Sequence, residues 1–148
     1  MSFKLIQDSR EQRPLEFKPG VFDEIVVEGL PYADYWAEID GKQIPLCFER
    51  KGFGDLYGTM TAGYPRFKRE LELAKENKFA IILLIEGSMR EVAGGYHHSK
   101  FTGDSMLKKL AMLYVRYGLE YHFFNDRREM SRYIEEVFSA VHRNFKEK

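Results

Sequence analysis

Two acidic residues and one lysine stand near the ends of two short segments that are expected to be extended strands. Asp34 begins the first segment, and Glu49 ends the second, with Lys51 two residues further on. Because strand side chains alternate between faces, Glu49 and Lys51 should point to the same side. Phosphodiester hydrolysis uses a divalent cation to position water and offset charge on phosphate oxygens, and such hard cations bind carboxylate oxygens. The spacing therefore favours a metal-assisted hydrolytic centre.

A β-hairpin is expected to bring these residues together. Residues 33–39 and 43–50 flank Asp40-Gly41, a pair that favours the positive φ angles of a tight turn. In the second arm, the alternation of side chains separates Glu49 and Lys51 from the opposite face. That opposite face carries three apolar residues, Ile44, Leu46 and Phe48. One face of the arm thus belongs to the core, and the other ends in charge.

The remaining apolar pattern predicts alternating strands and helices. The predicted strands are residues 3–6, 79–85 and 119–124, and the predicted helices are residues 65–78, 105–117 and 127–145. The continuous apolar run 79–85 is typical of a strand that is buried on both faces of a sheet. The resulting order is β, β-hairpin, α, β, α, β, α, which defines an α/β domain with a mixed central β-sheet flanked by helices.

Length and composition limit the class of protein. The 148 residues fit one domain, and Lys plus Arg equals Asp plus Glu at 23 each, so any positive charge that binds nucleic acid must be local. The single Cys47 is expected in the core, in a reducing compartment. Since neither a signal peptide nor an apolar run of about 20 residues is found, we expect a cytoplasmic protein without a membrane partner, nucleoid-associated if the source is prokaryotic or phage.

The sequence around the two acidic residues resembles that of a known nuclease family. The acid-x-Lys pattern of Glu49 and Lys51 is that of the PD-(D/E)xK nucleases, which share a restriction-endonuclease-like core. Ala33-Asp34-Tyr35 followed by Glu49-Arg50-Lys51 and then Asp55 is similar to the nuclease motif of the XPF family of structure-selective endonucleases. Two further runs, Asp8-Ser9-Arg10-Glu11 and Leu83-Leu84-Ile85-Glu86, resemble other parts of that domain. The similarity runs from about Lys4 to the final helix.

The resemblance implies roles for individual residues. Its metal ligands are Asp34, Glu49 and Asp55, with Asp8 as an alternative to Asp55, and the cation is Mg²⁺ or Mn²⁺. The carbonyl of Arg50 adds an oxygen to the catalytic set, and Lys51 orients or activates the attacking water. The DNA-binding residues are Arg10 and Arg66, joined on grounds of local charge by Lys68 and Lys100. Two other readings stay open, Asp8 as a turn residue paired with Arg10 and Asp55 as the N-cap of the next helix.

This sequence departs from the family pattern at three points. Ala33 replaces the family Gly before Asp34, a change expected to leave the carboxylate in place. The family Gly-Arg is represented by Gly63-Tyr64-Pro65-Arg66. The tandem helix-hairpin-helix domain of cellular members has no counterpart in residues 1–148, which are expected to form a nuclease domain only. A separate DNA-binding partner chain could supply that grip on duplex DNA.

The function expected from these features is metal-dependent cleavage of branched, flapped or junction DNA. An alternative is a Holliday-junction resolvase, which uses the same core as a dimer. An inactive DNA-binding or scaffold module is a second alternative, although the intact set of Asp34, Glu49 and Lys51 argues against it. Because nuclease domains of the family pair there, a homodimer is expected to form through the last two helices.

Overall fold

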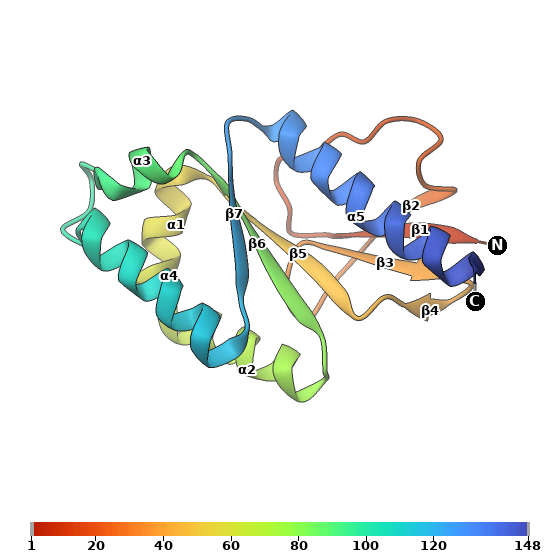
Figure 1. Cartoon of the computed structure of the whole chain (residues 1–148), viewed down its shortest axis with the longest axis horizontal. Helices are drawn as coiled ribbons and strands as arrows, with labels where there is room; N and C mark the ends of the chain where they lie inside the picture. Colours follow the sequence, from red (N-terminus) through yellow and green to blue (C-terminus); the bar gives the residue numbers. More distant parts are fainter. Residues whose placement is uncertain (1, 148) are drawn as a thin grey trace.

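The structure is a computed structural model that describes residues 2–147. Within that range, a mixed seven-stranded β-sheet runs through the molecule in the order β2-β1-β3-β5-β6-β7, with β4 paired to β3 (Figure 1). The strands are β1 (Phe3–Asp8), β2 (Glu24–Glu28), β3 (Tyr35–Ile39), β4 (Lys42–Gln43), β5 (Leu46–Lys51), β6 (Ala80–Glu86) and β7 (Glu120–Phe124). The helices are α1 (Phe53–Met60), α2 (Tyr64–Glu76), α3 (Met89–Ala93), α4 (Gly103–Tyr117) and α5 (Arg127–Glu147).

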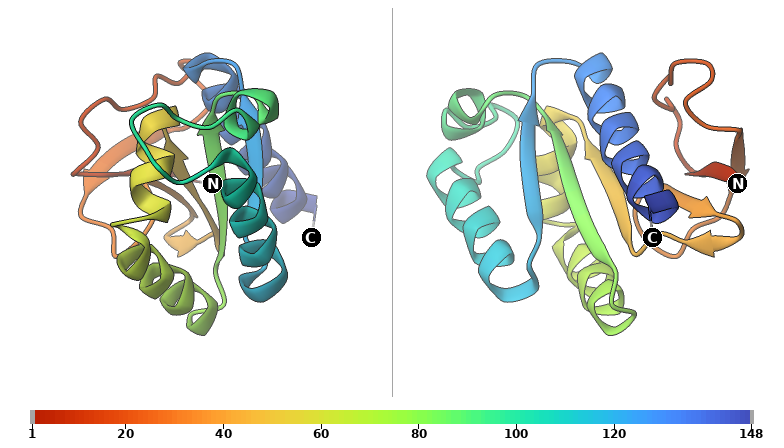
Figure 2. Two further views of the ribbon diagram at one scale, coloured as in Figure 1. Left: turned by 90° about the vertical axis from the view of Figure 1, so that its left-hand side faces the viewer. Right: turned by 45° about the vertical axis from the view of Figure 1, so that its right-hand side comes forward.

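Helices cover both faces of this sheet. Helices α1 to α4 lie on one side of the sheet, whereas α5 and the segment that precedes β2 lie on the other (Figures 1 and 2). Strands β5, β6 and β7 are parallel, and β3 runs antiparallel to both β1 and β5. The carboxyl ends of β5, β6 and β7 therefore meet at one edge of the sheet. The predicted α/β architecture with a mixed sheet is confirmed.

Each face of the sheet has its own apolar core. Cys47 of β5 and Leu83 of β6 face α1, α2 and α4 in one core, while Phe48 and Leu84 face α5 in the other. This split is the consequence of side-chain alternation along buried strands. No helix in the described part of the chain is long and apolar enough to cross a membrane.

The predicted hairpin is present, but its second arm is interrupted. Asp40 and Gly41 both take positive φ angles, 51° and 80°, as the tight turn requires. The prediction of one continuous strand over 43–50 is wrong, because β4 ends at Gln43 and β5 starts only at Leu46. Pro45 lies in the gap, where its missing N–H cannot serve a central ladder. The predicted division of faces is confirmed by the separate cores.

The structure contains three elements that the sequence analysis did not predict, namely β2, α1 and α3. Strand β2 is an exposed edge strand paired with β1, so its short apolar stretch gave no strong signal. Helix α1 is separated from α2 by a turn at residues 61–63, where a single helix was predicted from residue 65. Helix α3 lies in the stretch predicted to be irregular, and it begins with a capping box in which Ser88 and Glu91 exchange hydrogen bonds.

Helices α1 and α2, which carry part of the site described below, are held against α4 by Lys109. Its ammonium donates to the carbonyl of Met60 at 2.6 Å and lies 3.5 Å from the centre of the Tyr64 ring. Burial lowers the pKa of Lys109. One side chain of α4 thus satisfies the last turn of α1 and stacks on the first residue of α2.

Candidate active site

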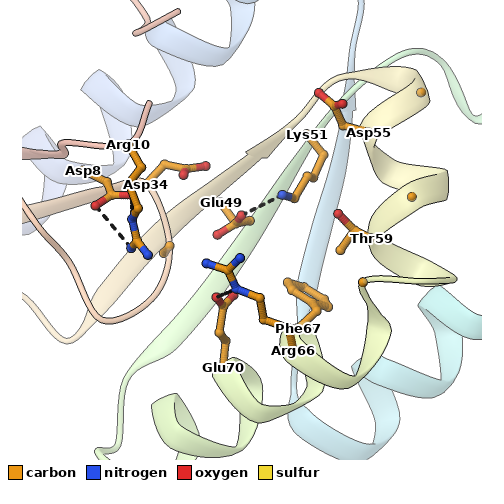
Figure 3. Close-up of a pocket in the computed structure, with 14 residues that line it drawn as sticks. Asp8, Arg10, Asp34, Glu49, Lys51, Asp55, Thr59, Arg66, Phe67 and Glu70 are labelled. Carbon is orange, nitrogen blue, oxygen red and sulfur yellow. Dashed lines mark hydrogen bonds and ion pairs between the residues drawn. The ribbon is translucent and has the colours of Figure 1, made fainter. Parts of the chain in front are cut away.

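A pocket of about 470 Å³ opens at the carboxyl end of β5, between the sheet and helices α1 and α2 (Figure 3). Its charged lining residues are the acids Asp8, Asp34, Glu49, Asp55 and Glu70 and the bases Arg10, Lys51 and Arg66. Five carboxyl groups face three cationic groups. The three residues on which the hydrolytic centre was predicted, Asp34, Glu49 and Lys51, are therefore brought together.

The carboxyl group of Asp34 is held in place by the backbone of β5. The N–H of Arg50 donates to Asp34 Oδ2 at 2.7 Å, and the N–H of Asp34 donates to the carbonyl of Phe48 at 2.9 Å. On the other side, the N–H of Asp8 donates to the carbonyl of Asp34 at 2.9 Å. Asp34 is thus fixed to both neighbouring strands before any ligand binds.

Ala33, which precedes Asp34, adopts a left-handed backbone with φ 63°. In this region a Cβ atom is unfavourable by about 1–2 kcal/mol, which explains why a glycine suits the position. The alanine methyl group is buried, and its packing offsets part of that cost. The expectation that Ala33 leaves the carboxylate in the pocket is consistent with this geometry.

Glu49 and Lys51 form an ion pair on the pocket face of β5. Lys51 Nζ lies 3.2 Å from Glu49 Oε1, and Glu49 is only 6% exposed. Figure 3 shows both side chains directed into the space that Asp34 faces from the neighbouring strand. The strand places an anion and a cation side by side, as the spacing of the two residues predicted.

The pocket holds its carboxyl groups in an unfavourable electrostatic state. Burial, together with repulsion from Glu49, raises the pKa of Asp34 to about 8. Burial also raises the pKa of Glu49, against the attraction of Lys51. For Lys51, burial acts to lower the pKa, but the attraction of Glu49 and Asp34 outweighs it and the pKa is raised. A cation between the two carboxyl groups would relieve both desolvation and repulsion.

Asp8 lines the pocket but is occupied by structural hydrogen bonds. Its carboxylate accepts from Arg10 Nε at 3.0 Å and from the N–H of Leu30 at 3.0 Å. Arg10 in turn donates to the carbonyl of Leu30 at 2.6 Å. These bonds fit the reading of Asp8 as a turn residue paired with Arg10, and they fasten the loop after β2 to the end of β1.

The side chain of Arg50 does not belong to the pocket. It lies on the opposite face of β5, where its Nε pairs with Glu11 at 3.3 Å, and the same carboxylate oxygen accepts from the Tyr35 hydroxyl at 3.1 Å. Strand alternation requires this, since Arg50 stands between Glu49 and Lys51. Only the backbone of Arg50 therefore lies beside Asp34, through its N–H, and the role of the Arg50 carbonyl as an oxygen donor to the metal stays a prediction.

Of the other predicted site residues, some line the pocket and others do not. Arg10 and Arg66 line the pocket, whereas Lys68 and Lys100 do not. Asp55 lines it from the exposed first turn of α1, but Gly52 is the N-cap of that helix, so the N-cap reading of Asp55 is wrong.

Sequence reasoning missed Glu70. This residue of α2 lines the pocket opposite Lys51, pairs with Arg66 at 3.6 Å, and has a pKa raised by burial. The available signal was its spacing, because Arg66 and Glu70 are four residues apart on a helix and share one face.

The donor set fits a divalent cation held by two carboxylates. Within residues 2–147, no group of three or more His, Cys, Asp or Glu side chains is arranged to hold a metal, so the predicted trio of Asp34, Glu49 and Asp55 is not assembled. Mg²⁺ is commonly held by one or two carboxylates, with water completing its shell. Asp34 and Glu49 meet that requirement, and a bound cation would stabilise the charged forms that burial disfavours in both groups.

Fold and site together define an α/β domain with an acid pair and a lysine at the carboxyl edge of a mixed sheet. The sequence model of the ERCC4 domain matches residues 7–137, and the chain therefore belongs to the ERCC4 domain family. No curated protein matches it by sequence search.

The fold is similar to that of solved XPF structures. XPF from Aeropyrum pernix matches with a TM-score of 0.70 and 18% identity, over 97% of this chain and 67% of that chain. XPF from Aeropyrum pernix in complex with DNA matches with a TM-score of 0.67 and 18% identity, over 95% of this chain and 65% of that chain. This chain thus spans about two thirds of the length of the matched proteins. The resemblance to the XPF family is confirmed.

Proposed function

We propose that this domain is a metal-dependent DNA endonuclease that acts on branched, flapped or junction DNA. The observation that carries the proposal is the half-buried Asp34 and the buried Glu49, which lie beside Lys51 in one open pocket. Membership of the ERCC4 domain family supports it, as does the similar fold of an XPF that was solved in complex with DNA. The chemistry proposed is hydrolysis of a phosphodiester bond.

Each pocket residue has a task in this proposal. Asp34 and Glu49 hold Mg²⁺ or Mn²⁺, which when bound polarises the phosphate and lowers the pKa of water. Lys51 points its ammonium at the same space and holds the attacking water or a phosphate oxygen. The exposed guanidinium groups of Arg10 and Arg66 stand at the rim of the pocket and bind phosphates next to the one that is cleaved.

The test uses labelled flap, fork, four-way junction and blunt duplex DNA with Mg²⁺, Mn²⁺ or EDTA. Cleavage is expected on at least one branched substrate and only with the metal. Glu49→Gln and Lys51→Met should each reduce the rate by about 10² to 10⁴-fold. Glu72→Gln, which removes an exposed carboxylate elsewhere on α2, is the matched control and should cleave normally. Cleavage in EDTA, or equal rates in all variants, would refute the proposal.

The same panel separates the two alternative functions. Paired symmetrical nicks across the four-way junction would indicate a resolvase. DNA binding without cleavage under any metal condition would indicate an inactive binding or scaffold module.

We also propose that two copies associate around the edge strand β7. Helices α4 and α5 lie on opposite sides of this edge (Figure 2). Val115 and Tyr114 of α4 are exposed, Val115 to 83%. Light scattering at high protein concentration should give the mass of two chains, and Val115→Asp should give the mass of one. A single-chain mass for the unmodified protein would remove the proposal.

A further inference from the structure

The active-site pocket continues around the edge of the sheet into two further hollows. A hollow of about 440 Å³ shares Arg10 and Asp55 with the active-site pocket. A third hollow of about 380 Å³ shares Arg13 and Arg127 with the second. Because neighbouring hollows share lining residues, they adjoin one another and form a row that leads away from Glu49 and Lys51.

The far end of this row is rich in arginine. The third hollow, here called the arginine hollow, is lined by Arg13, Arg127 and Arg128 and by one acid, Glu16. In a chain with no net charge, three guanidinium groups against one carboxylate are a local excess of positive charge. Guanidinium groups bind phosphate with two parallel hydrogen bonds, and this binding supplies most non-specific affinity for nucleic acid.

The wall of the arginine hollow is fixed by contacts between two distant parts of the chain. Arg127, the first residue of α5, donates through Nη2 to the carbonyl of Pro14 at 3.0 Å and also to the carbonyl of Arg13. These bonds tie the loop after β1 to the start of α5. The N-terminal end of this 21-residue helix adds a positive partial charge at the same place.

The position of the arginine hollow restricts the ligand. The active-site pocket lies on the side of α1 and α2, whereas α5 lies on the other side of the sheet (Figure 2). A ligand that reaches both must therefore turn around the carboxyl edge of the sheet. Duplex DNA has a persistence length of about 150 base pairs and resists such a turn, but a single strand bends easily.

We infer that the arginine hollow binds phosphates of a single DNA strand that continues from the phosphate in the active-site pocket. This inference rests on the proposed function and adds to it a phosphate-binding subsite outside the active-site pocket. Arg10 lies where the active-site pocket adjoins the second hollow. Arg13 and Arg128 bind the single strand further along, in the arginine hollow.

The experiment measures binding separately from cleavage. Fluorescence anisotropy in Ca²⁺ compares the affinity for a flap substrate with that for a blunt duplex of the same paired length, over a series of salt concentrations. The variant is Arg13→Gln combined with Arg128→Gln, two exposed side chains whose loss should not affect folding. The control is Arg116→Gln combined with Arg143→Gln, which removes the same charge at the distant ends of α4 and α5.

The arginine hollow variant should bind the flap about tenfold more weakly at low salt and bind the duplex unchanged. Each phosphate contact on a single strand contributes about 0.7 to the slope of log affinity against log salt, so the slope should fall by about 1.4. The control variant should match the unmodified protein on both substrates. No loss on the flap, an equal loss on flap and duplex, or no binding of any DNA would overturn the inference. Failure of the proposed function would be seen in the cleavage assay instead. There, the protein would not cleave DNA in Mg²⁺ or Mn²⁺, although it would still bind the flap and lose affinity in the arginine hollow variant.

Discussion

Replacement of Asp34 by asparagine should make the metal-free protein more stable at neutral and alkaline pH. Burial and repulsion from Glu49 raise the pKa of Asp34 from 3.8 to about 8 in the folded protein. Between these two values the folded state binds one proton more than the unfolded state. The contribution of Asp34 to stability is therefore fully present below about pH 4 and is lost as pH rises toward 8.

The size of this effect follows from the width of the pH window. Each pH unit inside it costs roughly 1.4 kcal/mol of unfolding free energy, so the change from pH 5 to pH 8 is on the order of 4 kcal/mol. The asparagine carries no charge in either state, and its side-chain oxygen can still accept the N–H of Arg50. The stability of Asp34→Asn relative to the unmodified protein should thus increase by about that amount and then level off above pH 8.

Urea unfolding in EDTA, followed by the fluorescence of the buried Trp36, measures the difference at each pH. Asp104→Asn, which removes an exposed carboxylate on α4, is the control and should run parallel to the unmodified protein. At pH 8, Mn²⁺ at 100 times its dissociation constant should stabilise the unmodified protein by up to about 2.7 kcal/mol. The same Mn²⁺ concentration should leave the stability of Asp34→Asn unchanged. Parallel curves for Asp34→Asn and the unmodified protein, or equal stabilisation of both by Mn²⁺, would refute the reasoning.

Further substitutions test how the pocket is supported, each by urea unfolding. Arg50→Met leaves the buried Glu11 carboxylate unpaired and should cost about 3 kcal/mol or more, much of which Glu11→Met in the same chain should restore; an additive loss would contradict the pairing. Lys109→Met removes the contacts with Met60 and Tyr64 and should cost about 1–2 kcal/mol, and an unchanged midpoint would exclude a supporting role. Gly103→Ala forces a Cβ atom into the carbonyl group of Ala93 and should destabilise, whereas Gly58→Ala meets no atom within 4 Å and should stabilise by up to about 1 kcal/mol; the reverse order would disprove the packing of α4 on α3.

The acid pair and the lysine could be predicted because short-range rules determine their positions. The Asp40-Gly41 turn sets the hairpin, and strand alternation then places Glu49 and Lys51 on one face and Arg50 on the other. Arg50 contributes to the pocket through its backbone and not through its side chain. Its backbone N–H is what contacts Asp34, a role that the residue type does not reveal.

Other parts of the site depend on long-range packing and could not be read from the sequence. Glu70 reaches the pocket only because α2 packs beside α1 on the sheet face that carries Glu49 and Lys51, and the contact between Arg127 and the 13–14 backbone joins segments more than 100 residues apart. No local pattern reports such a crossing. Helix α3 is a different case, since the Ser88 and Glu91 capping box was visible but was outweighed by the surrounding glycines and polar residues.

The pocket is electrostatically unfavourable without a cation, and the hydrogen bonds around it keep it from relaxing. Asp34 is bonded through its main chain to β1 and β5 and through its side chain to the N–H of Arg50, so it cannot move away from Glu49 without breaking contacts to two strands. Glu49 lies in the middle of the sheet, where its side-chain oxygen pairs with Lys51. The free energy of folding thus holds two carboxyl groups together that repel each other when charged. A divalent cation bound at that point neutralises both carboxylates and therefore gains the most binding free energy from the pocket. Because the pocket is already arranged, it needs no rearrangement when the phosphate binds.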